Sequence, residues 1–441
     1  MSIAVVGFGC RVAAAQTEAM RQALARAGMD ASDDALAAGT RAVVINGCAI
    51  TAAAEADARS LVRRIARERP GTAVLATGCW AHAAGASIAA LPGLAAIVPL
   101  ADHGAIAARV AEVLAAAPGD RTLVPATRLR RTPASSRPPL RLLPPVADAR
   151  GRALLQVQDG CDYACAFCIV PQLRGGSRSL PLPEVLSRAR DLVAAGAAEL
   201  VLTGVHLGTW GRDLGERGGV ATLLDALLSA VAGRARVRLS SLDPHELDDA
   251  LVERLAAAPG LCRHLHLSVQ SLDDGVLARM RRAHRAAPFL SRVRELVARV
   301  PGIAITTDVI AGHPGEDEAA FATTLARLSS LPLAGLHVFP FSPRPGTAAA
   351  TMADAVPTAI VRARAARLRA LDRSQRAAFR RARVGETLAL VCHRSFDAHG
   401  RLPARSDHDL AVFVAPADPA LRGQPIGARL QDDGVTATVL R

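Results

Sequence analysis

The sequence predicts an α/β protein: an N-terminal parallel α/β domain of the flavodoxin or Rossmann kind, a central partial TIM-type (β/α)6 barrel and a small C-terminal β-barrel. Three observations predict this. A strand signal ending in Gly-Cys occurs three times near the start, further strand signals then alternate with helical patterns, and the last stretch loses the helical period. The expected boundaries are 1–125, a linker at 126–146, then 147–380 and 381–441.

The first part contains an internal repeat. Ala4–Cys10, Ala42–Cys48 and Ala73–Cys79 all fit Ala-Val-(Val/Leu)-x-x-Gly-Cys. Helical patterns over Thr17–Ala27 and Ala53–Arg69 separate them, which favours a parallel sheet. The three cysteines are then expected at the carboxyl edge of that sheet, where open α/β folds bind ligands. Taken alone, they fit either buried structural thiols or metal ligands.

The remaining elements follow in order. Residues 128–145 hold five Arg and five Pro, which is typical of an extended basic linker. Arg362–Arg383 has nine Arg in 22 residues and predicts a basic helix. The expected strands of the barrel and of the tail are Ala153–Gln158, Glu199–Thr203, Arg236–Ser241, His264–Val269, Ile303–Ile310, Gly335–Phe339, Thr387–Cys392, Leu410–Val414 and Thr436–Leu440.

The composition limits the partner and the compartment. All 53 basic residues are Arg, and against 40 acidic residues the net charge is +13, with a pI near 10.8. This favours nucleic acid as a partner, and an anionic membrane surface second. The start has no secretory signal pattern, and the uncharged stretch Ala83–Ala101 is broken by Gly and Pro. We therefore expect a cytoplasmic protein whose eight cysteines are metal ligands or core residues rather than disulfides.

The strongest chemical signal is Cys161-x-x-x-Cys165-x-x-Cys168, directly after the first barrel strand. Three thiolates this close together suit a 4Fe–4S cluster and leave one iron open to a substrate or cofactor. Zinc normally takes four ligands, so a zinc site fits less well. Cys262 and Cys392 have no partner pattern, and we expect them to be core thiols.

This spacing resembles the radical S-adenosylmethionine superfamily. With the three N-terminal cysteines, the chain resembles the methylthiotransferases over essentially its whole length. The resemblance implies a second 4Fe–4S cluster on Cys10, Cys48 and Cys79, and an RNA-binding tail of the TRAM type. The supporting motifs are Arg174–Ser179, Leu202–Gly208, Ser240-Ser241, His264–Ser271 and Asp308–Glu316. The resemblance also implies that five residues lie near S-adenosylmethionine: Phe167, Gly204, Ser241, Gln270 and Asp308. It assigns no catalytic residue beyond the cluster ligands.

The segment His337–Thr347 is similar to the HVFPYSPRPGT of the tRNA-modifying members, where the branch acting on a ribosomal-protein aspartate has an acidic residue in place of Arg344. Gln158-Asp159, Arg11-Val12 and Thr17-Glu18 resemble the branch acting on N6-threonylcarbamoyladenosine. The implied function is 2-methylthiolation of that nucleoside at tRNA position 37. One S-adenosylmethionine would methylate a sulfur on the N-terminal cluster. A second would be cleaved to a radical that removes hydrogen from C2 of the adenine.

The implied partners are tRNA and an electron donor such as a flavodoxin or ferredoxin, with no membrane; the sulfur donor stays open. Three alternatives remain: the same chemistry on N6-isopentenyladenosine-37, a ribosomal-protein aspartate methylthiotransferase, and a non-catalytic iron–sulfur RNA-binding protein. Ferredoxin-like carriers usually bind each cluster with four cysteines, which counts against the last.

The chain departs from the family pattern at four places, Ala13–Ala15, Leu272, His313 and Asp407–Leu410. The basic helix would more often be a solvated face, but its place between barrel and tail favours phosphate contact. Few aromatics are available to stack on bases, so RNA recognition should depend mainly on charge and shape. The candidates for stacking are Phe396, Phe413, Trp80 and Trp210.

Overall fold

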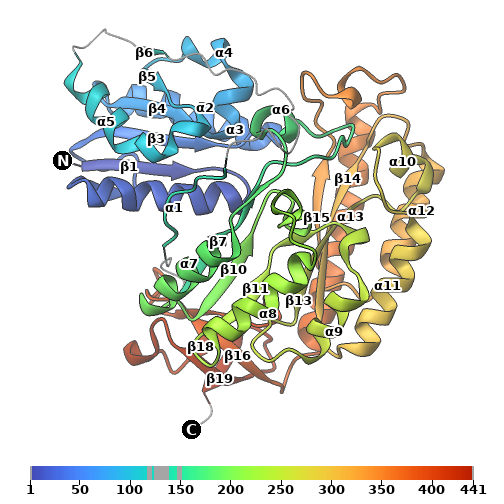
Figure 1. Cartoon of the computed structure of the whole chain (residues 1–441). Helices are drawn as coiled ribbons and strands as arrows, with labels where there is room; N and C mark the ends of the chain where they lie inside the picture. The colour runs from blue at the N-terminus through green and yellow to red at the C-terminus, as the bar shows by residue number, and fades with distance from the viewer. Residues whose placement is uncertain (1, 117–121, 124–138, 147–150, 440–441) are drawn as a thin grey trace. The chain divides into compact units, whose positions relative to one another are not determined.

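The computed structural model describes residues 2–116, 122–123, 139–146 and 151–439 (Figure 1). The chain forms two compact units. The first contains Met1–Val146, Gln158–Tyr163 and Cys168–Leu180, and the second contains the rest. The expected linker at 126–146 lies largely outside the described residues, and the four-part division of the chain stays a prediction.

The first unit is built on a parallel sheet, as predicted; it has six strands in the order β2-β1-β3-β4-β5-β6. Its strands are β1 (Ser2–Gly7), β2 (Asp30–Ser32), β3 (Thr40–Gly47), β4 (Ala73–Thr77), β5 (Leu94–Ile97) and β6 (Thr122–Leu123). Its helices are α1 (Arg11–Arg26), α2 (Ala52–Glu68), α3 (Gly78–Ala84), α4 (Ala86–Ala89) and α5 (Ile106–Ala115). The antiparallel pair β8 (Gln158–Asp159) and β9 (Arg178–Ser179) and the short α6 (Val170–Arg174) also belong to this unit.

Alternating residues of β3 pack on opposite faces of the sheet, so each face has its own core. Val43 and Ile45 pack with residues of α2, α3 and α4, while Ala42 and Val44 pack with residues of α1 and α5. The sheet is therefore covered by helices on both faces (Figure 1). In the described part of the chain, no helix is long and apolar enough to cross a membrane.

The second unit contains the predicted (β/α)6 partial barrel. Parallel strands form the sheets β11-β10-β7 and β12-β13-β14-β15, and only Ser240 separates β11 from β12. The strands are β7 (Arg152–Gln156), β10 (Glu199–Thr203), β11 (Arg236–Leu239), β12 (Ser241–Leu242), β13 (His264–Gln270), β14 (Ala304–Ala311) and β15 (Gly335–Pro340). The helices are α7 (Leu182–Ala194), α8 (Gly219–Val231), α9 (Asp249–Ala257), α10 (Asp274–Arg279), α11 (Ala286–Arg299), α12 (Glu318–Ser329) and the basic α13 (Thr358–Arg381).

Local sequence explains where several barrel helices begin. Asp248, Asp273 and Asp317 precede α9, α10 and α12, and each carboxylate accepts a hydrogen bond from an amide in the first turn. These caps satisfy amides that have no partner within the helix, and they favour the positive end of the helix dipole. The helix starts, and with them the loops at the strand ends, are thereby fixed.

The tail is a β-barrel, as predicted; it is closed and has five strands in the order β16-β17-β18-β20-β19. Its strands are β16 (Thr387–Cys392), β17 (Leu402–Ser406), β18 (Ala411–Ala415), β19 (Pro425–Leu430) and β20 (Thr436–Val439). The sequence pattern missed β17 and β19. Both contain a Pro, and β19 also a Gly, and these residues are signals against a strand.

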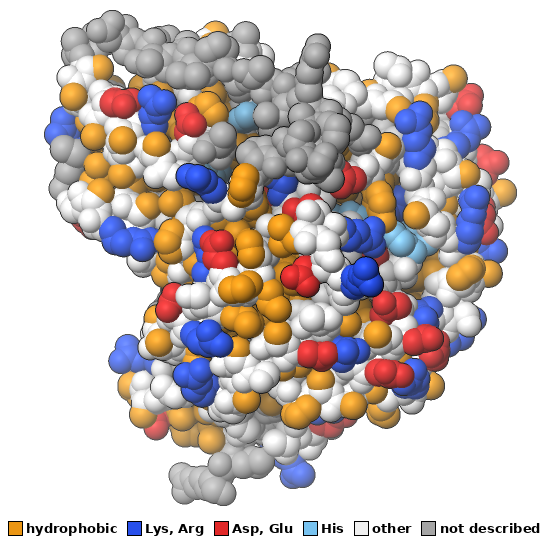
Figure 2. Space-filling view, in the orientation of Figure 1, with side chains coloured by type: hydrophobic (Ala, Val, Ile, Leu, Met, Phe, Trp, Pro, Cys, Tyr) orange, Lys and Arg blue, Asp and Glu red, His pale blue; other side chains and the backbone are white. Residues whose placement is uncertain are grey.

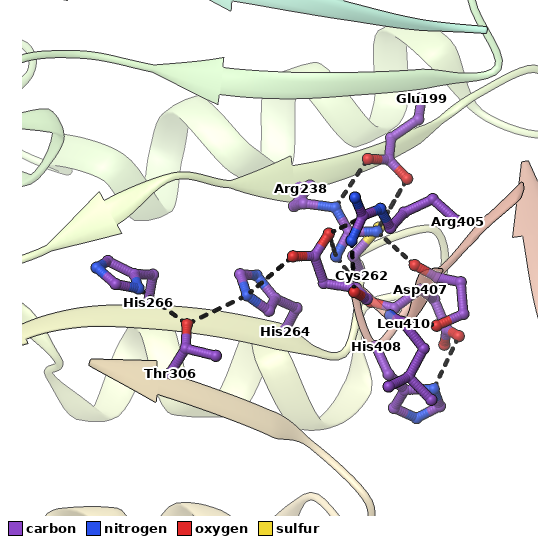
Figure 3. A network of polar contacts seen from close by, with 12 residues as sticks. Glu199, Arg238, Cys262, His264, His266, Thr306, Arg405, Asp407, His408 and Leu410 are labelled. Atoms are coloured by element: carbon purple, nitrogen blue, oxygen red, sulfur yellow. Dashed lines mark hydrogen bonds and ion pairs between the residues drawn. The ribbon is translucent and has the colours of Figure 1, made fainter. Parts of the chain in front are cut away.

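A buried ion network joins the tail to the partial barrel within the second unit (Figure 3). Glu199 of β10 is fully buried and accepts hydrogen bonds from Arg238 at 2.8 and 2.9 Å and from Arg236 at 2.7 Å. Arg238 also donates to the backbone oxygens of Ser406 at 2.7 Å and Asp407 at 3.0 Å. The departure at Asp407–Leu410 thus lies at this junction.

The two cysteines outside the cluster motifs are buried, as expected for core thiols. Cys262 lies beside Glu199 with its sulfur 3.9 Å from the carboxylate, and burial raises the pKa of its thiol to about 12. Cys392 lies in the core of the tail barrel, where burial raises the thiol pKa to about 11.

Candidate iron–sulfur and cofactor sites

The three N-terminal cysteines follow three neighbouring parallel strands. Cys10 is the N-cap of α1 after β1, Cys48 directly follows β3, and Cys79 is the second residue of α3 after β4. The pKa of the Cys48 thiol is raised to about 11 by burial, and the charges of Cys10 and Cys79 act in the same direction. The three cysteines therefore lie at the carboxyl edge of the sheet, where the repeat predicted them.

The glycines before Cys10 and Cys79 make room for this approach. A Cβ on Gly9, which has a φ of +108°, would lie 2.7 Å from the sulfur of Cys48. A Cβ on Gly78, at a φ of +83°, would lie 2.5 Å from the carbonyl oxygen of Gly47. Only glycine fits at these positions. Three converging thiols in a cradle lined by glycine fit a cluster with one open iron.

Cys79 has a buried arginine as its neighbour. Arg174, the last residue of α6, donates from Nε to the Cys79 sulfur at 3.0 Å. Its other nitrogens donate to Asp159 at 2.9 Å and to Gln16 at 3.1 Å. Burial raises the pKa of the Cys79 thiol, and the charge of Arg174 opposes that shift. Asp159 and Gln16 therefore hold the guanidinium against the sulfur.

The CxxxCxxC segment is a loop without helix or strand between β8 and α6. Residues 161–163 and 168 belong to the first unit, and 164–167 to the second. The first turn is braced by the Arg174–Ser179 motif: Gln158 donates to the Gly160 oxygen at 2.7 Å and to the Ser177 hydroxyl at 2.9 Å. A Cβ on Gly160 would lie 2.1 Å from the Gly176 oxygen, so this close approach requires glycine.

Within the second unit, Cys165 also contacts a buried arginine. Arg282, just after α10, donates to the Cys165 sulfur at 3.3 Å and to the Ser268 oxygen at 2.6 Å. It pairs with the buried carboxylate of Asp243. Nothing in the sequence motifs indicated Arg282, because its contact with Cys165 depends on how the strands are arranged in the fold.

The residues expected near S-adenosylmethionine all lie in the second unit. Ser241 of β12 is paired with His266 of β13, whose Nε2 is 3.0 Å from a carboxylate oxygen of Asp308 on β14. Gln270 ends β13 with a φ of +68° and is paired with Val309 of β14. Ser241, Gln270 and Asp308 are thus on adjacent strands. Gly204 follows β10 in the other sheet of the barrel.

The carboxylate of Asp308 has two histidines close to it. His266, and His337 at 3.5 Å from the same oxygen, hold the Asp308 pKa well below its usual range against the effect of burial. Thr306 contacts the other nitrogen of His266 at 2.8 Å and so orients the ring. The ligand atoms of the three residues lie within 4.8 Å of one another, an arrangement that can hold a cation.

Phe167, between two of the loop cysteines, packs with an apolar group in the second unit. This group includes Met280, Ile310 and Phe339, and His313 meets the Phe167 ring edge-on at 6.4 Å. Ile310 is two residues beyond Asp308 and on the same side of β14. An aromatic surface therefore lies next to the polar strand ends.

Comparison with known proteins identifies the family. A model described as the radical SAM superfamily matches residues 155–328, and one described as uncharacterized protein family UPF0004 matches residues 2–99. The chain is 35% identical to the threonylcarbamoyladenosine tRNA methylthiotransferase MtaB of Bacillus subtilis, over 84% of this chain and 80% of that protein. The chain belongs to the methylthiotransferase family of radical S-adenosylmethionine enzymes.

Other methylthiotransferases match over nearly the full length. The chain is 32% identical to MtaB of Rickettsia prowazekii, over 92% of both proteins. It is 34% identical to the tRNA-2-methylthio-N(6)-dimethylallyladenosine synthase of Sphingopyxis alaskensis, over 98% of this chain and 95% of that one. The solved structure of the radical S-adenosylmethionine methyltransferase TsrM from Kitasatospora setae has a TM-score of 0.56 at 15% identity, over 79% and 75% of the chains. That likeness concerns the fold alone.

The structure corrects the set of aromatics proposed to stack on RNA bases. Trp80 and Trp210 are fully buried, so both expectations were wrong. A Cβ on Gly47 would lie 2.7 Å from Trp80, which shows how closely this indole packs on the sheet. The half-buried Phe413 has the guanidinium of Arg401 at 3.8 Å from its ring centre. Recognition through charge and shape remains the expectation for this methylthiotransferase.

Proposed function

We propose that this enzyme converts N6-threonylcarbamoyladenosine at position 37 of tRNA to its 2-methylthio derivative. The observation that carries the proposal is two sets of three cysteines in a chain whose MtaB relatives match it over most of their length. Three cysteines per set leave an open iron in each cluster, and open sites bind reactants.

In this proposal each cysteine set holds one 4Fe–4S cluster. Cys10, Cys48 and Cys79 hold the auxiliary cluster on residues 1–125, and Cys161, Cys165 and Cys168 hold the other on residues 147–380. When bound, the clusters and S-adenosylmethionine supply the radical cleavage and the transferred methylthio group. Phe167, Gly204, Ser241, Gln270 and Asp308 bind and orient S-adenosylmethionine. The ionised Asp308 is suited to accept hydrogen bonds from ribose hydroxyls.

The partner is tRNA, bound through α13 and the tail at 381–441, and a flavodoxin or ferredoxin supplies electrons. On the face of the molecule in Figure 2, basic and acidic side chains are interspersed. On α13, however, Arg362, Arg369 and Arg373 are exposed, and none forms an ion pair with any described residue. They are spaced by seven and four residues, close to whole helical turns, and so form one stripe.

We expect this arginine stripe to account for part of the salt dependence of tRNA binding. A plot of the logarithm of the tRNA association constant against the logarithm of the salt concentration has a negative slope. Changing Arg362, Arg369 and Arg373 to Gln should make that slope shallower by about 2 to 3, because each lost phosphate contact changes it by roughly 1. The measurement is a fluorescence-anisotropy titration of tRNA at several salt concentrations. A matched variant changes Arg254, Arg292 and Arg299 to Gln; these pair with carboxylates and should leave the slope near that of the wild type.

The reaction itself is tested by nucleoside mass spectrometry of tRNA from a deletion strain, before and after complementation. We expect 2-methylthio-N6-threonylcarbamoyladenosine to disappear and to return with the gene. The second candidate substrate is N6-isopentenyladenosine, which the full-length match to the Sphingopyxis alaskensis enzyme favours. Loss of the methylthio-isopentenyl nucleoside instead would support that candidate. No change in any tRNA nucleoside would favour the ribosomal-protein or non-catalytic alternatives.

A further inference from the structure

Each of the two units holds a buried arginine against one cysteine of the cluster motifs. In the first, Arg174 donates to Cys79; in the second, Arg282 donates to Cys165. The two side chains are 3% and 5% exposed. Each arginine also pairs with a buried aspartate, Asp159 and Asp243 respectively. The same three-part arrangement of sulfur, guanidinium and carboxylate thus occurs twice.

We propose that Arg174 and Arg282 are positioning residues that stabilise the reduced form of the cluster whose cysteine each one contacts. This rests on the proposed function, because it assumes that the two cysteine sets hold clusters. Reduction adds one negative charge to a cluster, and hydrogen bonds to the ligating sulfurs are among the factors that set its potential. A cation in a dry environment favours the more negative state strongly, because little solvent screens the interaction.

The geometry fixes Arg174 tightly. Its Nε, Nη1 and Nη2 each have a different partner: the Cys79 sulfur, Asp159 and Gln16. The planar fork can therefore neither rotate nor move away without losing a buried hydrogen bond. A lysine in its place would keep the charge but could not reach three partners in these directions.

Arg174 lies on the segment that directly follows the cluster-motif residue Cys168. It is six residues after Cys168, and all of residues 168–174 belong to the first unit. In this segment Ile169 and Leu173 pack with Ala49 and Cys79. The stretch that begins at a ligand of one proposed cluster is thus packed and hydrogen-bonded against a ligand of the other. A change at Arg174 should therefore be felt mainly at the auxiliary cluster.

The test is a redox titration of the full-length, reconstituted protein with dithionite, monitored by electron paramagnetic resonance. The two reduced signals are told apart because only the cluster that binds S-adenosylmethionine should respond to its addition. Arg174→Gln should lower the midpoint of the other cluster. The expected change is roughly tenfold in the ratio of reduced to oxidised cluster at a fixed potential, about 59 mV for one electron. Arg282→Gln should instead lower the midpoint of the cluster that responds to S-adenosylmethionine. In Arg174→Lys the midpoint of the other cluster should lie between those of the wild type and Arg174→Gln.

Two controls match the change in charge. Arg178 lies 3.9 Å from the same Asp159, and Arg279 is three residues before Arg282 and pairs with Asp354. Arg178→Gln and Arg279→Gln should leave both midpoints unchanged. Iron and sulfide are counted for every protein. If the wild type binds no clusters, the proposed function fails. If the clusters are present and the midpoints of Arg174→Gln and Arg282→Gln do not move, this inference fails. It also fails if Arg174→Lys loses half of its iron, since the arginine then only supports the fold.

Discussion

Replacing Cys48 by alanine should abolish methylthio transfer and leave reductive cleavage of S-adenosylmethionine in place. The proposal assigns Cys48 to the auxiliary cluster and Cys165 to the other, so the two half-reactions should separate. Product formation should fall at least about a thousandfold, since loss of a residue that only supports a metal ligand already costs 10- to 100-fold. Cys165→Ala should abolish both the product and the formation of 5′-deoxyadenosine. Both are measured by mass spectrometry in anaerobic single-turnover assays.

The matched control for this prediction is Cys392→Ala. Cys392 is also buried, and burial likewise raises its thiol pKa to about 11, but it lies in the core of the tail barrel. The substitution should cost about 1 kcal/mol of unfolding free energy and leave the iron content unchanged. If Cys48→Ala still formed the methylthio product at the wild-type rate, Cys48 would be no ligand. Loss of 5′-deoxyadenosine in the same variant would show that the two sites do not work separately.

The convergence of the N-terminal cysteines was predictable because it follows from topology alone. Three repeats of one strand pattern, joined by helices, form parallel neighbours, and residues just past parallel strands meet at one edge. The structure places Cys10, Cys48 and Cys79 after β1, β3 and β4 accordingly. The same geometry explains Gly9 and Gly78, whereas Gly47 leaves room for Trp80. Local pattern was sufficient here because each cysteine's position is set by the end of its own strand.

The contacts of Arg174 and Arg282 were not predictable from any local pattern. Arg174 lies 95 residues from Cys79 and Arg282 lies 117 residues from Cys165. The chain has 53 basic residues, all of them Arg, and composition gives no reason to single out two. The same limit explains the errors on Trp80 and Trp210, because a count of aromatics does not show which rings are buried. Burial and long-range pairing depend on the assembled fold.

Glu199→Gln should destabilise the second unit by about 3–5 kcal/mol, the usual cost of leaving a buried charge without its partner. Glu199 is fully buried, and its carboxylate binds the guanidinium groups of Arg236 and Arg238. Glutamine keeps the shape but removes the charge, so buried Arg238 keeps only the partly exposed carboxylate of Asp409, 3.9 Å away, as a counter-charge. Arg238 also holds two backbone oxygens at the start of the junction with the tail. The attachment of the tail barrel should therefore weaken in the same variant, while the hydrogen bonds from Arg394 to backbone oxygens of the partial barrel remain.

The measurement is urea unfolding followed by tryptophan fluorescence. The chain has two tryptophans, so a Trp80→Phe background leaves Trp210 as the reporter of the second unit. The control is Glu295→Gln, which removes a half-exposed partner of Arg292 and Arg299 and should unfold near the wild-type midpoint. Equal midpoints for Glu199→Gln and the control would show that the buried network contributes nothing to stability.

The difference in unfolding free energy between wild type and Glu199→Gln should depend on pH. The arginines hold the pKa of Glu199 well below its ordinary value of 4.5 in the folded protein, although burial alone would raise it. The unfolded chain therefore binds a proton at Glu199 before the folded protein does. The stability that Glu199 contributes is fully present above about pH 4.5 and is lost as the pH falls from there toward the folded-state pKa. Because glutamine does not titrate, the difference in unfolding free energy between wild type and Glu199→Gln should be constant near neutral pH and should narrow below about pH 4.5. A difference that widened in acid would mean that the folded protein binds the proton first, with Glu199 neutral in the core.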